Sequence, residues 1–110
     1  MSRVSNFILV GLALIFTLNL IGCDMTAERE LKRAERAINE AQQYDAEEHA
    51  TDDYRAAEEL LNEAAELAKD GRIQEARQTA INAKLRAEDA MRKAKERARI
   101  LEQEMEEIGR

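Results

Sequence analysis

The chain has 110 residues, which is room for one small domain, and its 17 basic and 23 acidic residues give a formal net charge of −6. Such an acidic chain is a poor candidate for nucleic-acid binding, because phosphate contacts need an excess of Lys and Arg. Its single Cys excludes an internal disulfide and a cysteine-based metal site, and the chain contains no Pro and no Trp.

The first residues of the chain have the pattern of a secretory signal. Arg3 supplies a positive charge, and a mostly apolar run follows from Phe7 to Gly22. As a helix this run would span roughly 24 Å, which is short for a hydrocarbon core of about 30 Å. A positive start, a short apolar stretch and a small residue before the cleavage point predict a signal peptide over residues 1–22.

The stretch Leu20-Ile21-Gly22-Cys23 resembles the lipobox of bacterial lipoproteins, in which an aliphatic residue and a small residue precede the lipidated Cys. The resemblance implies cleavage between Gly22 and Cys23, acylation of Cys23 and a lipidated tether over residues 23–25. Two or more acyl chains hold a protein on a bilayer without a transmembrane helix, since each buried CH₂ contributes about 0.8 kcal/mol. An ordinary signal peptide or a membrane anchor with an incidental Cys is the alternative.

Asp24 follows the lipobox directly. In enteric bacteria an Asp at this place resembles the sorting signal that keeps lipoproteins in the inner membrane. Other bacteria use other rules, and a polar tether would also begin with such a residue. Both the inner and the outer membrane therefore stay open as destinations.

The mature chain is expected to form one alanine-rich helical domain over residues 26–110. It is built mainly from Ala, Glu, Arg, Lys, Leu and Gln, which are strong helix formers. Apolar residues recur at spacings of four and three from Ala27 to Ala41, which predicts a first helix over 26–43. Thr26 is its expected N-cap.

A kink or short loop is predicted within residues 44–51. The apolar stripe fails there, because its continuation would bring acidic residues such as Asp45 to the core face. A second helix in a new phase is predicted over 52–69, with Thr51 or Asp52 as its N-cap.

Asp70-Gly71-Arg72 is the clearest turn signal in the mature chain. Gly71 suits the left-handed residue that ends a helix. A third helix is predicted over 72–108, with alanines at spacings of three and four. Its stripe shifts by four residues at Ala98, in the manner of a stutter in a heptad pattern.

These helices predict an all-α fold. The expected architecture is a long antiparallel helical hairpin, coiled-coil-like and kinked near 44–51, with its turn at Gly71. The alternative is a compact three-helix bundle. In that bundle the helix over 26–43 folds back at the kink and runs parallel to the helix over 72–108.

Charge favours the hairpin. In an antiparallel fold-back at Gly71, the basic run from Arg92 to Arg99 faces acids near Asp45, and the acids of residues 102–107 face bases of the first helix. Exposed pairs contribute only about 0–1 kcal/mol each, so charge would select the register rather than stabilise the fold. The alternative for the basic run is contact with anionic lipid or cell-wall polymer.

The mature chain has few residues with the chemistry of a catalytic site. His49, the only His, lies in the predicted break beside several carboxylates, where a polar linker is a better interpretation than a metal site. The sequence contains no Gly-rich phosphate loop and no nucleophile–base pair. We expect a protein that is not an enzyme, with no cofactor, no metal and no small-molecule substrate.

Two family resemblances bear on function. Residues 54–80 resemble one tetratricopeptide-type helical pair, although a single repeat cannot stack into a solenoid. Residues 27–98 resemble the alanine-rich bacterial lipoproteins grouped as domain of unknown function 4398. In those proteins too, a lipobox precedes Ala-spaced helices, a Gly turn and a long Ala-rich helix. This resemblance implies a location in the cell envelope and no assigned activity.

The sequence therefore predicts a non-enzymatic protein anchored through lipid on Cys23, acting as a structural spacer or scaffold. It would lie on the bacterial cell membrane or the outer membrane and face the periplasm or the cell exterior. The alternative is a periplasmic adaptor whose helices dock a partner protein or another copy of the chain.

Overall fold

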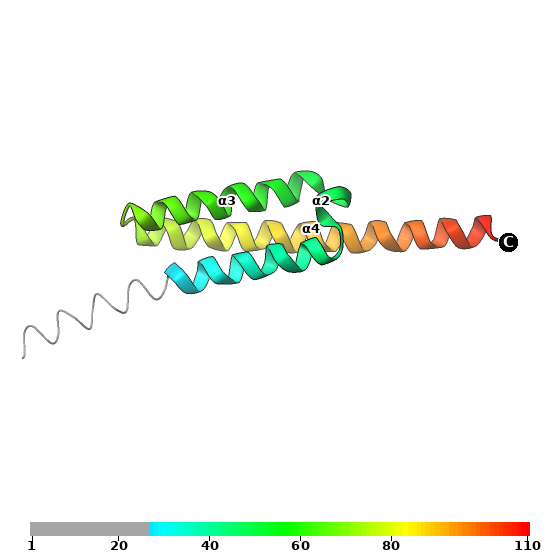
Figure 1. Cartoon of the computed structure of the whole chain (residues 1–110), viewed down its shortest axis with the longest axis horizontal. Coiled ribbons are helices and arrows are strands. Elements are labelled where there is room, and N and C mark those ends of the chain that lie inside the picture. The colour runs from blue at the N-terminus through cyan, green and yellow to red at the C-terminus, as the bar shows by residue number, and fades with distance from the viewer. Residues whose placement is uncertain (1–26) are drawn as a thin grey trace, which may run out of the picture.

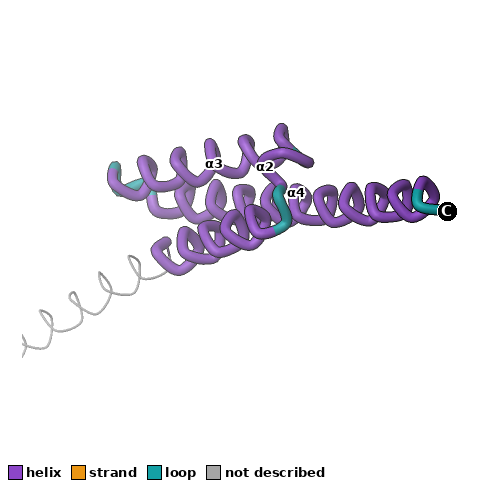
Figure 2. Tube along the Cα trace, turned by 45° about the vertical axis from the view of Figure 1, so that its right-hand side comes forward, coloured by secondary structure: helices purple, strands orange, loops and turns teal. Residues whose placement is uncertain are grey.

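The computed structural model describes residues 27–110, which form helices joined by three short connections and contain no strand within that range (Figures 1 and 2). The N-terminal helix covers residues 27–43. It is followed by α2 (Ala46–His49), α3 (Thr51–Lys69) and α4 (Ile73–Ile108). The predicted all-α fold is confirmed. The predicted signal peptide, the lipobox and the Thr26 cap lie outside the described residues.

The N-terminal helix and α3 both lie alongside α4 (Figures 1 and 2). α3 runs antiparallel to α4 after the turn at Gly71, which confirms that part of the predicted hairpin. The N-terminal helix runs parallel to α4 (Figure 1), and its Arg33 and Arg36 line a groove with Lys84 and Glu88 of α4. The chain therefore folds back at the predicted kink, and the arrangement is the three-helix alternative rather than one continuous arm from 26 to 69.

Asp45 reverses the chain between the N-terminal helix and α2. Its backbone is left-handed, with φ 58° and ψ 36°, a conformation that Asp and Asn adopt more readily than other L-residues. The Tyr44 N–H donates to the Ala41 carbonyl over 3.1 Å, and the Asp45 N–H donates to the Gln42 carbonyl over 3.0 Å. This tight reversal is what separates a folded-back bundle from a merely kinked arm.

Thr51 joins α2 to α3 and does not cap α3. Its Oγ1 donates to the carbonyl oxygens of Glu47, over 2.8 Å, and Glu48, over 3.3 Å. Ala50 takes the N-cap position of α3 and makes no side-chain cap bond. The prediction of Thr51 or Asp52 as N-cap is therefore wrong, because the hydroxyl of Thr51 bonds back to the preceding turn.

Gly71 forms the predicted turn between α3 and α4. Its φ of +79° is left-handed. The Gly71 N–H donates to the Ala68 carbonyl over 3.2 Å, and the Arg72 N–H donates to the Leu67 carbonyl over 2.9 Å. These two bonds form a Schellman motif, which satisfies the last carbonyls of α3 and turns the chain back along it.

The core consists almost entirely of alanine. The buried residues of α4 recur at spacings of four and three, and the larger buried side chains come from Ile38 and Tyr54. Small side chains let the helix axes approach toward the lower end of the usual range of about 8–10 Å. The buried alanines of α4 are Ala76, Ala80, Ala83, Ala87, Ala90 and Ala94.

Candidate functional site

The residues predicted from the lipobox are Gly22, Cys23 and Asp24, and all three lie outside the described residues. Gly71 has the turn role predicted for it. His49 is half-buried at the end of α2, beside Arg92 and other residues of α4. Within residues 27–110 no group of three or more His, Cys, Asp or Glu side chains is arranged to hold a metal ion.

Asp53 is the one strongly buried aspartate of α3, with 8% of its surface exposed. Arg86 donates to its Oδ1 over 3.1 Å, and Lys93 donates to its Oδ2. The pKa of Asp53 lies below its ordinary value, mainly because Lys93 donates a hydrogen bond to the carboxylate. Burial raises this pKa and so opposes the shift, whereas the hydrogen bond from Arg86 lowers it further. The cluster ties α3 to α4 and has no nucleophile beside it, so we assign it to the fold.

Asp53 was not among the residues singled out in the sequence, although a signal for it exists. Asp53 is in helical phase with Ala57 and Ala64, both of which are fully buried. An acid on the apolar stripe of a helix must meet a base from another helix or lose its charge. The basic run of α4 offers the matching partners, which makes Asp53 predictable in principle.

The basic run of α4 meets fewer acids than charge matching predicts. Lys93 reaches Asp53, but Arg92 pairs with Asp89 over 3.2 Å, within α4 itself. The Lys95 Nζ lies 4.5 Å from the centroid of the Tyr44 ring, as a cation–π contact. The run therefore does lie beside the break at 44–51, as predicted, with different partners.

The predicted pairing of the C-terminal acids with the N-terminal helix is wrong. Arg33 and Arg36 line a groove together with Lys84 and Glu88, far along α4 from residues 102–107. The reason is the direction of the N-terminal helix, which runs parallel to α4 (Figure 1). A parallel helix places its bases beside the first half of α4.

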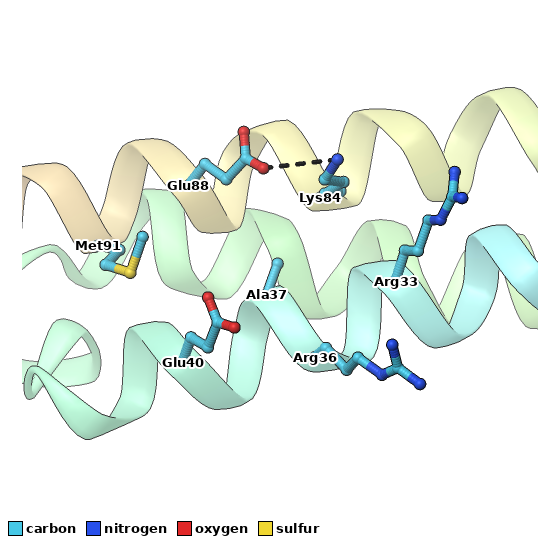
Figure 3. Close-up of a pocket in the computed structure, with 7 residues that line it drawn as sticks. All are labelled: Arg33, Arg36, Ala37, Glu40, Lys84, Glu88 and Met91. Carbon is cyan, nitrogen blue, oxygen red and sulfur yellow. Dashed lines mark ion pairs between the residues drawn. The ribbon is translucent and has the colours of Figure 1, made fainter.

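An open groove of about 500 Å³ runs along the surface between the N-terminal helix and α4. Figure 3 shows Lys84 and Glu88 on α4, joined by an ion pair of 3.7 Å, opposite the side chains of the N-terminal helix. The bases of this groove, Arg33, Arg36 and Lys84, lie toward one end, and its acids, Glu40 and Glu88, lie toward the other (Figure 3). Met91 and Ala37 supply its apolar surface. Its lining residues are Arg33, Arg36, Ala37, Glu40, Lys84, Glu88 and Met91.

The free end of α4, residues 98–108, extends beyond the other helices (Figures 1 and 2). Every residue in it is exposed except the half-buried Leu101. Three large apolar side chains face solvent: Ile100 is 36% exposed, Met105 73% and Ile108 86%. Exposed apolar side chains on a solitary helix mark this segment as the main candidate for contact with another molecule.

A second hollow, of about 390 Å³, lies where the free end of α4 leaves the bundle. We call it the basic hollow, because three of its side chains are bases and His49 borders it. Its single acid, Glu96, is paired with Arg99 over 2.8 Å. The residues of the basic hollow are His49, Arg92, Lys93, Glu96, Arg97 and Ile100.

Both the groove and the basic hollow are open surfaces beside α4. None of the helices described within residues 27–110 has the length and apolar character of a membrane span. Comparisons with protein-family models, with curated proteins and with solved structures find no match to this chain.

Proposed function

We propose that the protein is a lipid-anchored, non-enzymatic spacer of the bacterial cell envelope, held on a membrane by acylated Cys23. The observation that carries this proposal is the stretch Leu20-Ile21-Gly22-Cys23, placed after a short apolar run and before an abrupt change to a charged, Ala-rich chain. The proposed location is the cell membrane or the outer membrane. The proposed family is that of the alanine-rich lipoproteins that residues 27–98 resemble.

The direction of the helices supports a spacer. The N-terminal helix begins at the end of the bundle where α3 turns into α4, and the free end of α4 lies at the opposite end (Figure 1). A tether that begins four residues before residue 27 would therefore attach the end away from the free segment. With 36 residues, α4 is roughly 54 Å long at the usual helical rise. The free end of α4 would be held away from the membrane surface.

A second function, as an adaptor, is favoured by a separate observation. Ile100, Met105 and Ile108 are exposed on the free end of α4, which extends beyond the other helices (Figure 1). A spacer alone has no need of apolar side chains at its outer end. The two functions are compatible, because a spacer that holds the free end of α4 away from the membrane would make it available to a partner.

Replacement of Cys23 tests the anchor. We expect the full chain, expressed with its own leader in bacteria that are fed a clickable fatty acid, to incorporate the label and to sediment with membranes. Cys23→Ser should abolish labelling and block cleavage before residue 23. Met25→Ser, two residues away in the same tether, is the matched control and should keep both. Normal processing and membrane association of Cys23→Ser would refute the lipoprotein assignment.

A further inference from the structure

One face of α4 joins the basic hollow to the acidic free end. Lys93, Arg97, Ile100, Glu104 and Glu107 recur at spacings of four, three, four and three, so their side chains leave the helix on one side. The first three line the basic hollow, and the last two lie in the free end. This face is open to solvent at the point where α4 leaves the bundle.

Opposite charges are separated along this part of α4. Residues 92–99 contain five bases and one acid, whereas residues 102–107 contain four acids and no base. Several of the bases already have partners, since Lys93 contacts Asp53 and Arg92 contacts Asp89. Arg97 and the four acids of residues 102–107 make no ion pair within the described part of the chain.

We propose that two copies of this chain associate through this face, with their α4 helices antiparallel and centred on Ile100. In this register Ile100 meets Ile100 of the second copy, and Arg97 lies opposite Glu104 of the second copy. Lys93, whose ammonium also contacts Asp53 of its own copy, lies level with Glu107. Each pair occurs twice by symmetry, because an antiparallel pair of identical helices makes the same contacts from both sides.

The antiparallel direction follows from the charges. A parallel pair would bring residues 92–99 of both copies together and residues 102–107 of both copies together, with like charges opposed along the whole contact. The antiparallel pair instead sets the basic half of each helix against the acidic half of the other. It also places the two bundles at opposite ends of the paired helices, where they do not collide.

The face that carries Ala98, Leu101 and Met105 is less suitable for this pairing. It continues the buried stripe that ends at Ala94, so a helix laid along it would run into the connection at 44–50. The basic hollow is open at the same level. Ile108 of the second copy would lie level with Arg92 and add apolar contact at the edge of the hollow.

The association should be weak and sensitive to salt. Exposed ion pairs contribute little each and are screened as ionic strength rises. The apolar part of the contact is small, with Ile100 at its centre. If the chain is also lipid-anchored, confinement to a surface would raise the effective concentration of the copies. The pairing itself depends on α4 and not on Cys23, so the two proposals can fail separately.

Thiol crosslinking tests the register in the full chain. Ile100→Cys, expressed with the natural leader, places one thiol at the proposed two-fold axis. In a low-salt lysate that retains both the membranes and the soluble protein, a short thiol–thiol crosslinker should convert this variant to a dimer. Ala98→Cys, two residues before Ile100 and so on nearly the opposite side of α4, should give at least about tenfold less dimer, because its thiols point away from each other. Equal yields from the two variants would refute the proposed face.

Charge reversal tests the pairing of Arg97 with Glu104. In the Ile100→Cys background, Arg97→Glu alone or Glu104→Arg alone should lower the yield of dimer about tenfold, since two symmetric pairs become repulsive. Co-expression of the two variants should restore it, because each then carries the complement of the other. Arg99→Glu makes the same charge change away from this face and should have little effect. Failure of co-expression to restore the dimer would overturn the proposed contact.

Discussion

Arg86 of α4 lies against Asp53 of α3, with its Nη1 3.1 Å from the carboxylate Oδ1. Lys93, two helical turns further along α4, contacts the other carboxylate oxygen. Asp53 is buried, whereas the side chains of Arg86 and Lys93 are more than half exposed. One buried carboxylate therefore takes both of its charge-assisted hydrogen bonds from the facing helix, which fixes the register of α3 against α4.

Asp53→Asn should destabilise the protein. The amide keeps the size of the side chain but loses the charge that the two bases compensate, and its NH₂ group faces one of these donors. We expect the free energy of unfolding to fall by about 1–2 kcal/mol, measured by urea denaturation followed by circular dichroism. Asp52→Asn is the matched control, because Asp52 is exposed and should tolerate the change. An equal loss in both variants would contradict the role assigned to Asp53.

Asp53 should also make stability depend on pH in the acid range. Its pKa is lower in the folded protein than the ordinary value of 3.8. A lowered pKa means that the folded state holds the proton less tightly than the unfolded state. The stabilisation from Asp53 is therefore fully present above the ordinary value and is lost as the pH falls through the folded pKa.

The acid effect can be isolated by comparing the wild-type protein with Asp53→Asn. The difference in their free energies of unfolding should be constant near neutral pH and should shrink below pH 3.8. Other carboxylates titrate in both proteins, so the difference removes their contribution. A difference that stays constant down to the acid transition would show that Asp53 does not retain its charge in the way proposed here.

The sequence predicts the helices and their breaks because these are local properties. The stripe from Ala76 to Ala94 needs only helical periodicity, and Gly71 needs only the left-handed conformation of a C-cap. The failure of the stripe at 44–51 likewise locates the break. The direction in which the chain leaves that break is different, because it depends on the backbone of Asp45, which periodicity does not report.

Charge matching predicted the wrong topology, because exposed ion pairs are weak. The antiparallel register proposed for the acids of residues 102–107 would have gained a few pairs of about 0–1 kcal/mol each. Folding back instead buries Ala34, Ile38 and Ala41 of the N-terminal helix beside α3 and α4. Burial of apolar surface outweighs exposed charge pairs, so the bundle forms and leaves those acids on the free end of α4.

The candidate site, like the fold, has one part that the sequence predicts and another that depends on the tertiary structure. The motif at Cys23 is predicted from residue types alone, because it is a run of consecutive residues and needs no tertiary contact. The basic hollow is lined by His49 of α2 and by residues of α4. It forms because α4 continues beyond the point where the other helices end. Residues 97 and 104 of α4 can be read as a basic and an acidic position, but their exposure follows only from the length of α3.

The left-handed backbone of Asp45 predicts a distinct response to substitution. Asp45→Gly should leave the free energy of unfolding unchanged or raise it slightly, because Gly adopts this conformation without steric cost. Asp45→Val should lower it by about 1–2 kcal/mol, since a β-branched side chain is strained there. Thermal melting of both variants checks this. Equal melting temperatures would show that Asp45 is not held in the left-handed region in solution.

The alanine seam predicts that larger side chains are rejected where helices touch and accepted where α4 is free. Ala90 is fully buried between α4 and its neighbours, so Ala90→Leu must push the helices apart and should cost about 1–3 kcal/mol of unfolding free energy. Ala98→Leu is the matched control, because Ala98 belongs to the same stripe two turns further along and is exposed. It should change stability by less than about 0.5 kcal/mol. Urea denaturation measures the free energy of unfolding of both variants. A large loss of this free energy in Ala98→Leu would mean that this face of the free end is also covered by a helix.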